Sequence, residues 1–529
     1  MLMPTSGSPF SPAVDAASPR RLISLRRAIH RLGPVFEEQP PLARLAAWPA
    51  YRWLVVGTVC VGAFMGQLDA SIAGLVLPTL EDVFGAPVAS VEWVAIAYLL
   101  TLAALVVPLG RLADLLGRKT LYTWGFVVFS VGSAACGLAP GLGWLVGFRV
   151  LQACGAAMLQ ANSVAIITAA VPRRVLGRAI GVQGAAQAVG LSVGPSVGGL
   201  LIDAFGWQWV FFIAVPFGLL GTVLGWLVLP CTSRQASAEA AAEPERFDWL
   251  GAALLGPAVA LVLLGLTYGN TWGWTSPSLL LVGVAAAVCL VTLAWTEGRS
   301  ASPLVDPALL RVRTFSLGLL AGLLSYAVLF GSLFLLPFYL ERILGQTPAQ
   351  TGLLLTPVPI ALGMMAPASG ALVDRIGPIP PTVAGMLAAA AALLGLATAP
   401  VGPLAATLGL LALLGVGLGL FTPPNNSTVM GSAPAHRLGV AGGILNMTRS
   451  LGTSLGVAAT GTVLAVRLAT RLGTQVARTI DAPPSALLPA LHETLLFLAG
   501  LAVMAALLSA TRGSQPAASG AQWHTDGGL

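Results

Sequence analysis

The feature that most constrains the fold is a short motif that the chain contains twice. Around Asp114 the sequence reads G-x-x-x-D-x-x-G, and the same spacing recurs around Asp374 in the second half. The glycines of the two motifs are Gly110 and Gly117, then Gly370 and Gly377. Further along, Pro172 is followed by three glycines whose offsets are repeated after Pro434. The two halves of the chain therefore share one plan.

The composition indicates that both halves of the chain lie in a lipid bilayer. Hydrophobic residues make up 56% of the 529 residues, charged residues only 9%, and the mean hydropathy is +0.86. Apolar runs of about 20 residues, long enough to cross about 30 Å of hydrocarbon, recur from Trp53 to Ala510. About fourteen such runs can be counted. Repeated membrane halves of one orientation are typical of transporters whose halves rock around a central site.

We therefore predict an all-α polytopic membrane protein of about fourteen transmembrane helices. Two six-helix bundles, related by a pseudo-twofold axis along the membrane normal, would flank two extra middle helices. In the basic N-terminal tail, an interfacial amphipathic helix and a disordered flank fit the sequence equally well. The predicted segments are an N-terminal tail (1–52), a first bundle (53–230), a linker (231–248), two additional helices (249–297), a second linker (298–313), a second bundle (314–511) and a C-terminal tail (512–529).

Arginine placement predicts the orientation, because loops retained in the cytoplasm are enriched in Lys and Arg. On this map about 21 of the 27 basic residues fall in the tails and the even-numbered loops. Both termini of this multi-pass protein are therefore expected on the cytoplasmic side of the cell membrane. Several of the exceptions lie in the stretch 467–488, so the side of that stretch is left open.

Several classes of function are disfavoured by the residues present. Lys119 is the only lysine and follows Arg118 rather than glycine, so the chain lacks the G-K-S/T of a phosphate-binding loop and is not expected to hydrolyse ATP. No H-E-x-x-H or G-x-S-x-G pattern occurs. The net charge of +7 comes from residues that flank apolar spans. We expect no enzyme activity, cofactor, metal site or nucleic-acid partner; the expected partners of this monomer are a small-molecule substrate, protons and membrane lipids.

Without ATP, energy must come from an ion gradient or from substrate flow, and ionisable residues inside spans indicate such coupling. Asp69 lies about 24 Å along the first span and Arg149 about 10 Å into the fourth from the opposite side, so their depths nearly match. A carboxylate beside a guanidinium is stabilised as the ion, whereas a desolvated lone carboxylate holds its proton. A conformational change that separates them would move a proton. A static pair that locks the two helices together is the alternative.

A third ionisable residue, Arg449, lies near the middle of the thirteenth span at the repeat position of Gln187. A lone arginine is costly in lipid, so its side chain should face the bundle interior. There it would meet carbonyls, a hydroxyl or an anionic substrate group, and the sequence leaves these three open.

Polar and adaptable apolar side chains near this depth predict a central substrate cavity, because helices interrupted by Gly or Pro at corresponding places in both halves are typical of binding sites. For the polar members, hydrogen bonding between helices is the alternative. The residues predicted to line the cavity are Met158, Gln160, Asn162, Ser163, Gln187, Met364, Met365, Phe421, Asn425, Asn426 and Arg449.

From about Trp53 to Ala510 the chain resembles the major facilitator superfamily, specifically its fourteen-span drug/proton antiporter branch. The stretch 110–119 looks like the family's loop motif after span two, whose charges stabilise one conformation. Arg149 and Gln152 are similar to its proton-transfer motif, although Ala153 stands where glycine is usual. The stretch 190–199 resembles the span-five motif of antiporters. The residues assigned to conformational motifs on this basis are Gly110, Asp114, Gly117, Arg118, Lys119, Gln152, Gly190, Gly194, Pro195, Gly198, Gly199 and Asp374.

This resemblance implies a proton-coupled secondary active exporter, a drug/proton antiporter that carries amphipathic small molecules, cationic ones among them, by alternating access. Asp69 and Arg149 would take part in proton coupling. A transporter of lipids or lipid-linked molecules with the same fold is the alternative function.

Overall fold

The structure is a computed structural model of the whole chain. It describes residues 38, 40–86, 88–231, 248–299, 307–346, 348–398, 404–434, 437–472 and 483–512, apart from a few side chains within helices, Asp374 and Pro195 among them. Most of the predicted N-terminal tail, including its candidate interfacial helix, lies outside the described residues. Every contact given below lies within the unit Gln39–Leu529.

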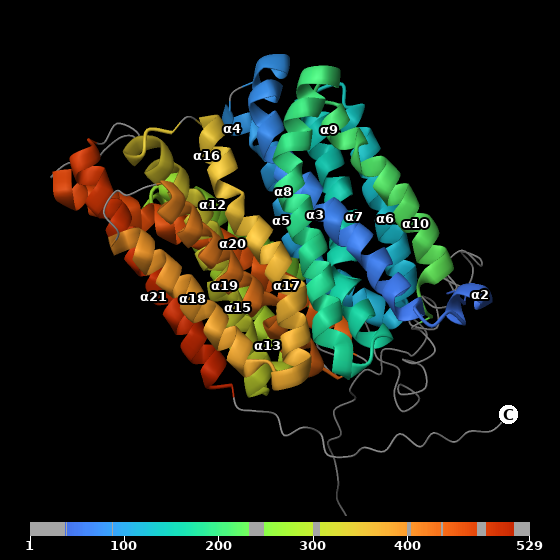
Figure 1. The fold of residues 1–529 in the computed structure, drawn as a ribbon. Coiled ribbons are helices and arrows are strands. Elements are labelled where there is room, and N and C mark those ends of the chain that lie inside the picture. The colour runs from blue at the N-terminus through green and yellow to red at the C-terminus, as the bar shows by residue number, and fades with distance from the viewer. Residues whose placement is uncertain are drawn as a thin grey trace, which may run out of the picture. The chain divides into compact units, whose positions relative to one another are not determined.

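In the described part of the chain all regular structure is helical (Figure 1). After the short α2 (Ala43–Ala46), the helices of the N-terminal half, residues 51–228, are α3 (Tyr51–Phe84), α4 (Val88–Val91), α5 (Trp93–Leu116), α6 (Arg118–Gly137), α7 (Leu142–Ala170), η2 (Arg173–Val175), α8 (Leu176–Phe205), α9 (Trp209–Phe212) and α10 (Ala214–Val228). The middle pair is α12 (Trp249–Trp272) and α13 (Pro277–Glu297).

The remaining helices follow the same plan. After α14 (Pro307–Arg311), the C-terminal half, residues 313–510, contains α15 (Arg313–Phe338), η4 (Tyr339–Ile343), α16 (Pro348–Leu355), α17 (Pro357–Ile376), α18 (Ile379–Thr398), α19 (Leu404–Gly431), α20 (Leu438–Leu472) and α21 (Pro484–Ala510). The last helix begins at Pro484, where proline is well tolerated because it lacks only an N–H that would have no intrahelical partner.

Thirteen helices of the described residues are long and apolar enough to cross a membrane. The 30-residue α8 is not among these thirteen, although its length would suffice. The predicted total of fourteen spans and the division into two six-helix bundles therefore stay predictions. The middle pair packs as a hairpin, and α12 lies against α5 and α20. The side chain of Trp274, in the α12–α13 turn, donates a hydrogen bond to Thr462 of α20 at 3.0 Å.

Glycines bring the helices of each half close together. A Cβ on Gly417 of α19 would lie 2.5 Å from the carbonyl oxygen of Gly385 on α18 and 2.6 Å from the nitrogen of Ala389. Because lipid tails provide no hydrophobic force between helices, such close backbone packing is a main source of helix association in a bilayer.

Glycines also bring the two halves together, and these contacts lie toward one end of the helices. Gly110 of α5 packs on the backbone of Gly439 in α20, and Gly370 of α17 packs on Gly177 in α8. We call this the Asp114 end, after the aspartate of α5 that lies there. The first two turns of α20, residues 438–445, belong to the same hydrophobic core as α5 and α7. The halves are thus packed at the Asp114 end as tightly as a protein interior.

Farther from the Asp114 end, α8 and α20 pack against helices of their own halves. The backbone of α3 lies against Gly190 of α8, and the backbone of α15 lies against Gly452 of α20. Figure 1 shows the blue and green N-terminal half on one side and the orange and red helices of the C-terminal half on the other. Contacts between the halves made by glycines therefore lie between mid-helix and the Asp114 end.

Replacing Gly417 by alanine is expected to destabilise the C-terminal half, because the added methyl group would overlap the backbone of α18. Overpacking of this kind costs about 1–3 kcal/mol. Gly409→Ala on the same helix is the matched control, because a Cβ there meets nothing within 4 Å. Thermal unfolding in detergent, followed by the helical circular dichroism signal, should show a lower midpoint for Gly417→Ala alone. Equal midpoints for the two variants would contradict this packing.

Candidate functional site

A buried ion pair joins α3 to α7. Nη1 of Arg149 lies 2.9 Å from Oδ2 of Asp69 and 3.1 Å from Oδ1. Only 1% of the arginine side chain and 3% of the aspartate side chain are exposed. The two residues that the sequence places at matching depths are therefore in direct contact.

The surrounding groups satisfy both charges. Nε2 of Gln152 donates to Asp69 at 2.8 Å, while its Oε1 accepts from Arg149 at 2.7 Å. Nε of Arg149 donates to the backbone oxygen of Val94 at 3.0 Å, and the Tyr98 ring centroid lies 4.2 Å from the guanidinium carbon. Buried charges are tolerated when they are paired and hydrogen-bonded in this way. The cluster thus links α3 to α7 through groups whose polar atoms are partnered inside the protein.

Asp114 connects the two halves at the end that bears its name. Its Oδ1 accepts from the backbone N–H of Gly439 at 2.9 Å and its Oδ2 from that of Val440 at 3.1 Å. Since α20 begins at Leu438, the carboxylate lies at a helix N-terminus, where unpaired N–H groups and the helix dipole favour an anion. Nη2 of Arg118 also donates to this carboxylate at 2.7 Å.

The other residues of the loop motif support the same region. Gly117 joins α5 to α6 with a φ of 103°, which glycine adopts without strain. Nζ of Lys119 donates to the backbone oxygens of Trp226 and Leu229 at 2.9 and 2.8 Å. These carbonyls lie around the end of α10, where helix carbonyls have no intrahelical partner. The lysine therefore acts within the N-terminal half. The side chain of Asp374 lies outside the described residues.

The motif at 190–199 holds α8 against α3. A Cβ on Gly190 would lie 2.5 Å from a backbone oxygen of α3, and Gly194 packs directly on the side chain of Ser71. This close approach requires glycine. Of the remaining motif residues, Gly198 is buried, Gly199 has open space where a Cβ would point, and the side chain of Pro195 lies outside the described residues.

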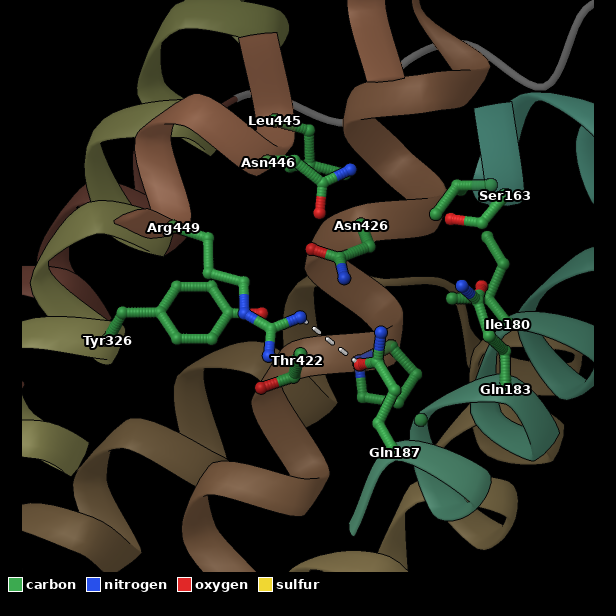
Figure 2. A pocket seen from close by; sticks show the side chains of 13 residues that line it. Ser163, Ile180, Gln183, Gln187, Tyr326, Thr422, Asn426, Leu445, Asn446 and Arg449 are labelled. Atoms are coloured by element: carbon green, nitrogen blue, oxygen red, sulfur yellow. Dashed lines mark hydrogen bonds between the residues drawn. The ribbon is translucent and has the colours of Figure 1, made fainter. Parts of the chain in front are cut away.

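A cavity lies where the halves meet at mid-helix (Figure 2). Side chains from α7, α8, α15, α19 and α20 enclose about 430 Å³ of empty volume, which includes the part open to solvent. A second cavity of about 280 Å³, lined by the N-terminal half, shares Ser163 and Gln187 with the first. We call the two together the central cavity.

Arg449 extends across the central cavity from α20. Figure 2 shows its guanidinium beside Tyr326 and directed toward Gln187 of α8. The distance from Nη1 to Oε1 of Gln187 is 3.5 Å, and the Tyr326 ring centroid lies 5.5 Å from the guanidinium carbon. With its amide oriented to satisfy both partners, Gln67 of α3 accepts from Nη1 at 3.3 Å and also from Nη2. Among the described residues no carboxylate pairs with this arginine.

Five of the residues predicted for the cavity line it, namely Gln160, Ser163, Gln187, Asn426 and Arg449. Two polar residues do not. Asn162 donates to the backbone of its own helix at 2.8 Å, and Asn425 is buried against α15. Asn162 therefore bonds within its own helix and not between helices. Asn425 packs against a neighbouring helix instead of facing the cavity.

The four apolar residues predicted for the cavity are not among the described residues that line these two cavities. Met364 is 76% exposed on the outer face of α17. Met158 packs on Gly125 of α6, and Met365 packs on Gly419 of α19. Phe421 is 1% exposed in the core of the C-terminal half. Each side chain points along the helical face that its own packing requires, which composition alone does not reveal.

Several residues of the site were missed by the sequence reasoning. Gln67, Gln183, Tyr326 and Asn446 line the central cavity, and Ser133 accepts a hydrogen bond from Gln152. Polarity inside apolar spans was the signal available for the two glutamines and for Asn446. In the described part of the chain no group of three or more His, Cys, Asp or Glu side chains could hold a metal ion.

The fold and the site define a membrane protein with a charged cluster in one half and a cavity between two related halves. The sequence profile of the Major Facilitator Superfamily matches residues 59–255 and 249–457. The chain belongs to this superfamily and is a multi-pass membrane transporter. The resemblance noted from the motifs is confirmed at this level, and the names of its relatives agree with the drug/proton antiporter branch.

Relatives in bacteria include several resistance proteins. The chain is 34% identical over 424 residues to Multidrug resistance protein Stp of Mycobacterium tuberculosis (strain ATCC 25618 / H37Rv), covering 80% of this chain and 78% of the relative. It is 34% identical to the Tetracenomycin C resistance and export protein of Streptomyces glaucescens, covering 79% and 76%. It is 32% identical to the Riboflavin transporter RibZ of Clostridioides difficile (strain 630), covering 77% and 87%.

Solved structures agree on the fold. The human organic anion transporter MFSD10 (TETRAN) superposes with a TM-score of 0.60 at 15% identity, covering 87% of this chain and 99% of that one. The proton:xylose symporter XylE superposes with a TM-score of 0.58 at 14% identity, covering 87% and 95%. At these identities the likeness shows the fold alone.

Asp114→Asn is expected to loosen the junction of the halves, because it removes the charge at the start of α20 and leaves one carbonyl oxygen to accept from two N–H groups. Spin labels on cysteines that replace Arg174 and Arg375, two exposed residues near the Asp114 end on opposite halves, would measure the separation. The five native cysteines would be replaced first. Pulsed electron paramagnetic resonance should show a new population at longer distance.

The control for this measurement is Asp248→Asn. Asp248 also caps a helix, accepting from the backbone N–H of Gly251 at 2.7 Å, but it lies at the start of α12 outside the junction. Its loss should leave the label distances unchanged. An identical distance distribution in wild type and Asp114→Asn would show that the carboxylate does not hold the halves together.

Proposed function

We propose that this chain is a proton-coupled exporter of amphipathic small molecules that works by alternating access. It would take up substrate in the central cavity, exchange a proton at Asp69 and release substrate on the other side of the membrane. The resistance and export names of its bacterial relatives support this class of substrate and direction of transport. The cationic preference implied by the family resemblance is not carried into the proposal, because no acidic side chain is found among the described residues that line the central cavity.

The observation that carries the proposal is the position of α3 between the ion pair and the cavity. Gln67 contacts Arg449 in the cavity, and Asp69, two residues later, contacts Arg149 of α7. Residues two apart on a helix point to nearly opposite faces. A change at Asp69 therefore acts on the helix whose other face lines the cavity.

Protonation supplies such a change. The carboxylate of Asp69 is held to α7 by its charge, since both of its oxygens accept from Arg149. A neutral carboxyl group loses most of this attraction and is tolerated in an apolar setting, whereas an ionised one is not. Proton binding would thus favour release of α3 from α7, and deprotonation would favour the paired state.

The packed Asp114 end supports alternating access. With the halves joined there through Asp114 and the two glycine pairs, the central cavity is sealed from that side. Positive residues gather at this end, among them Arg118, Lys119 and Arg437, which supports a cytoplasmic assignment for it and for both termini. We assign the protein to the cell membrane, as a monomer with an outward-facing resting conformation.

Asp69→Asn is expected to abolish gradient-driven transport while folding survives, because asparagine can keep hydrogen bonds to Gln152 and Arg149 but carries no exchangeable charge. Purified protein in sealed vesicles would be tested for uptake of riboflavin, ethidium and 2-naphthalenesulfonate under an imposed pH gradient. The variant should transport no faster than wild type treated with a protonophore.

Glu493→Gln is the matched carboxylate control for this experiment. Glu493, in the first half of α21, pairs with Arg467 and Arg471 of α20, and 32% of its side chain is exposed. Its transport should equal that of wild type. Gradient-driven uptake by Asp69→Asn at the wild-type rate would remove this aspartate from proton coupling, and no uptake of any probe by wild type would count against the proposed function.

A further inference from the structure

The central cavity carries a positive charge that the protein does not neutralise. Among the described residues that line the cavity, Arg449 is the one that carries a charge, and the polar lining is otherwise made of amides, hydroxyls and backbone. Its contacts are the neutral oxygens of Gln67 and Gln187 and the ring of Tyr326. The potential inside the cavity is therefore positive.

Arg149, the other arginine deep inside a span, shows how this chain stabilises a buried cation with its own groups. Arg149 is 1% exposed and has its own carboxylate, an amide oxygen and a backbone oxygen as partners. An arginine within a span is costly without such partners. Arg449 faces an open volume instead of a carboxylate. A negatively charged ligand in this volume would supply the counter-charge that Arg449 lacks.

The geometry of Arg449 suits an oxyanion. A guanidinium presents five N–H donors in a planar fork, which matches the two oxygens of a carboxylate, sulfonate or phosphate. Arg449 donates to the neutral oxygens of Gln187 and Gln67, and a bound oxyanion would replace these weak contacts with a charged one.

The rest of the lining fits an apolar body attached to that anion. Val164, Ile180 and Leu445 provide aliphatic surface, and the Tyr326 ring lies beside the guanidinium. A ligand with a planar apolar part and one negative group would bury both portions at once. An organic cation would meet the same apolar surface but would be repelled by Arg449.

From these observations we infer that the central cavity selects amphipathic anions, with Arg449 binding the carboxylate, sulfonate or phosphate group of the substrate. The inference rests on the proposed function for its biological setting, because it names the substrate class of the same cavity. The anion can come from a soluble molecule or from a lipid headgroup, which present the same chemistry to the arginine.

Binding without any gradient tests this inference separately from proton coupling. The full chain in phosphatidylcholine nanodiscs would be titrated by calorimetry with three probes that share a naphthalene body: 2-naphthalenesulfonate, 2-naphthalenemethanol and 2-naphthylmethylammonium. The sulfonate should bind at least about tenfold more tightly than the other two, which is the effect expected of one charge-assisted hydrogen-bonding site.

Two variants remove the uncompensated charge by different routes. Arg449→Gln deletes it, and Gln187→Glu places a carboxylate beside Nη1 while keeping the arginine. Both should lose the preference for the sulfonate. Arg467→Gln is the matched control, because Arg467 has 55% of its side chain exposed and pairs with Glu493 outside the cavity. Size-exclusion chromatography reports folding, and the comparison of the three probes on wild type needs no variant.

A second arm identifies the source of the anion. Nanodiscs in which part of the phosphatidylcholine is replaced by phosphatidylglycerol should weaken sulfonate binding to wild type if a lipid phosphate occupies the site. Unchanged sulfonate binding in these discs would assign the site to soluble anions. Either result is consistent with anion recognition at Arg449.

Two results would overturn the inference: tighter binding of the ammonium than of the sulfonate by wild type, or undiminished sulfonate binding by folded Arg449→Gln. The proposed function fails on different grounds. If gradient-driven transport is intact but the charge preference is absent, the exporter is supported and this substrate class is not. If the sulfonate is selected but no gradient-driven transport occurs, the anion site is supported and proton coupling is not.

Discussion

A single carboxylate at the start of a helix makes the closed arrangement of this molecule feasible. The first turn of α20 is buried between α5 and α7, where its N–H groups have no water to bind. Asp114 supplies acceptors for two of them, and Arg118 balances its charge. Once these groups are satisfied, the glycines beside them allow the two backbones to meet. The closed side of the cavity follows from this junction.

The repeat explains why the junction has two backbone crossings of the same kind. Gly370 packs on the start of α8 as Gly110 packs on the start of α20, so both crossings use a glycine against a helix N-terminus. Two such crossings constrain the halves better than one, since a single contact would leave them free to pivot about it. Separation at this end has to break both crossings, whereas the contacts of Gly190 and Gly452 remain within their own halves.

The depth of a residue along its span was predictable from the sequence, but the direction in which its side chain points was not. A rise of about 1.5 Å per residue sufficed to place Asp69 opposite Arg149, because both lie on long uninterrupted helices. The rotation of each helix about its axis depends on packing against its neighbours, and this is why Met364 points outward. The partners of Arg449 were hidden for a related reason. Gln67, Gln187 and Tyr326 come from three other helices, which only the tertiary structure brings to one point.

A difference between the halves concerns two residues that face each other across the cavity. Gln187 and Arg449 are 262 residues apart, occupy the same repeat position and are in contact across the cavity. Two arginines there would repel each other, and two glutamines would leave the cavity neutral. With one of each, the C-terminal half supplies the charge and the N-terminal half supplies an acceptor that can be displaced. The N-terminal half also holds the Asp69–Arg149 pair, so α3 connects a titratable site to the arginine of the opposite half through Gln67. Divergence at these positions gives the duplicated scaffold two chemically unlike halves.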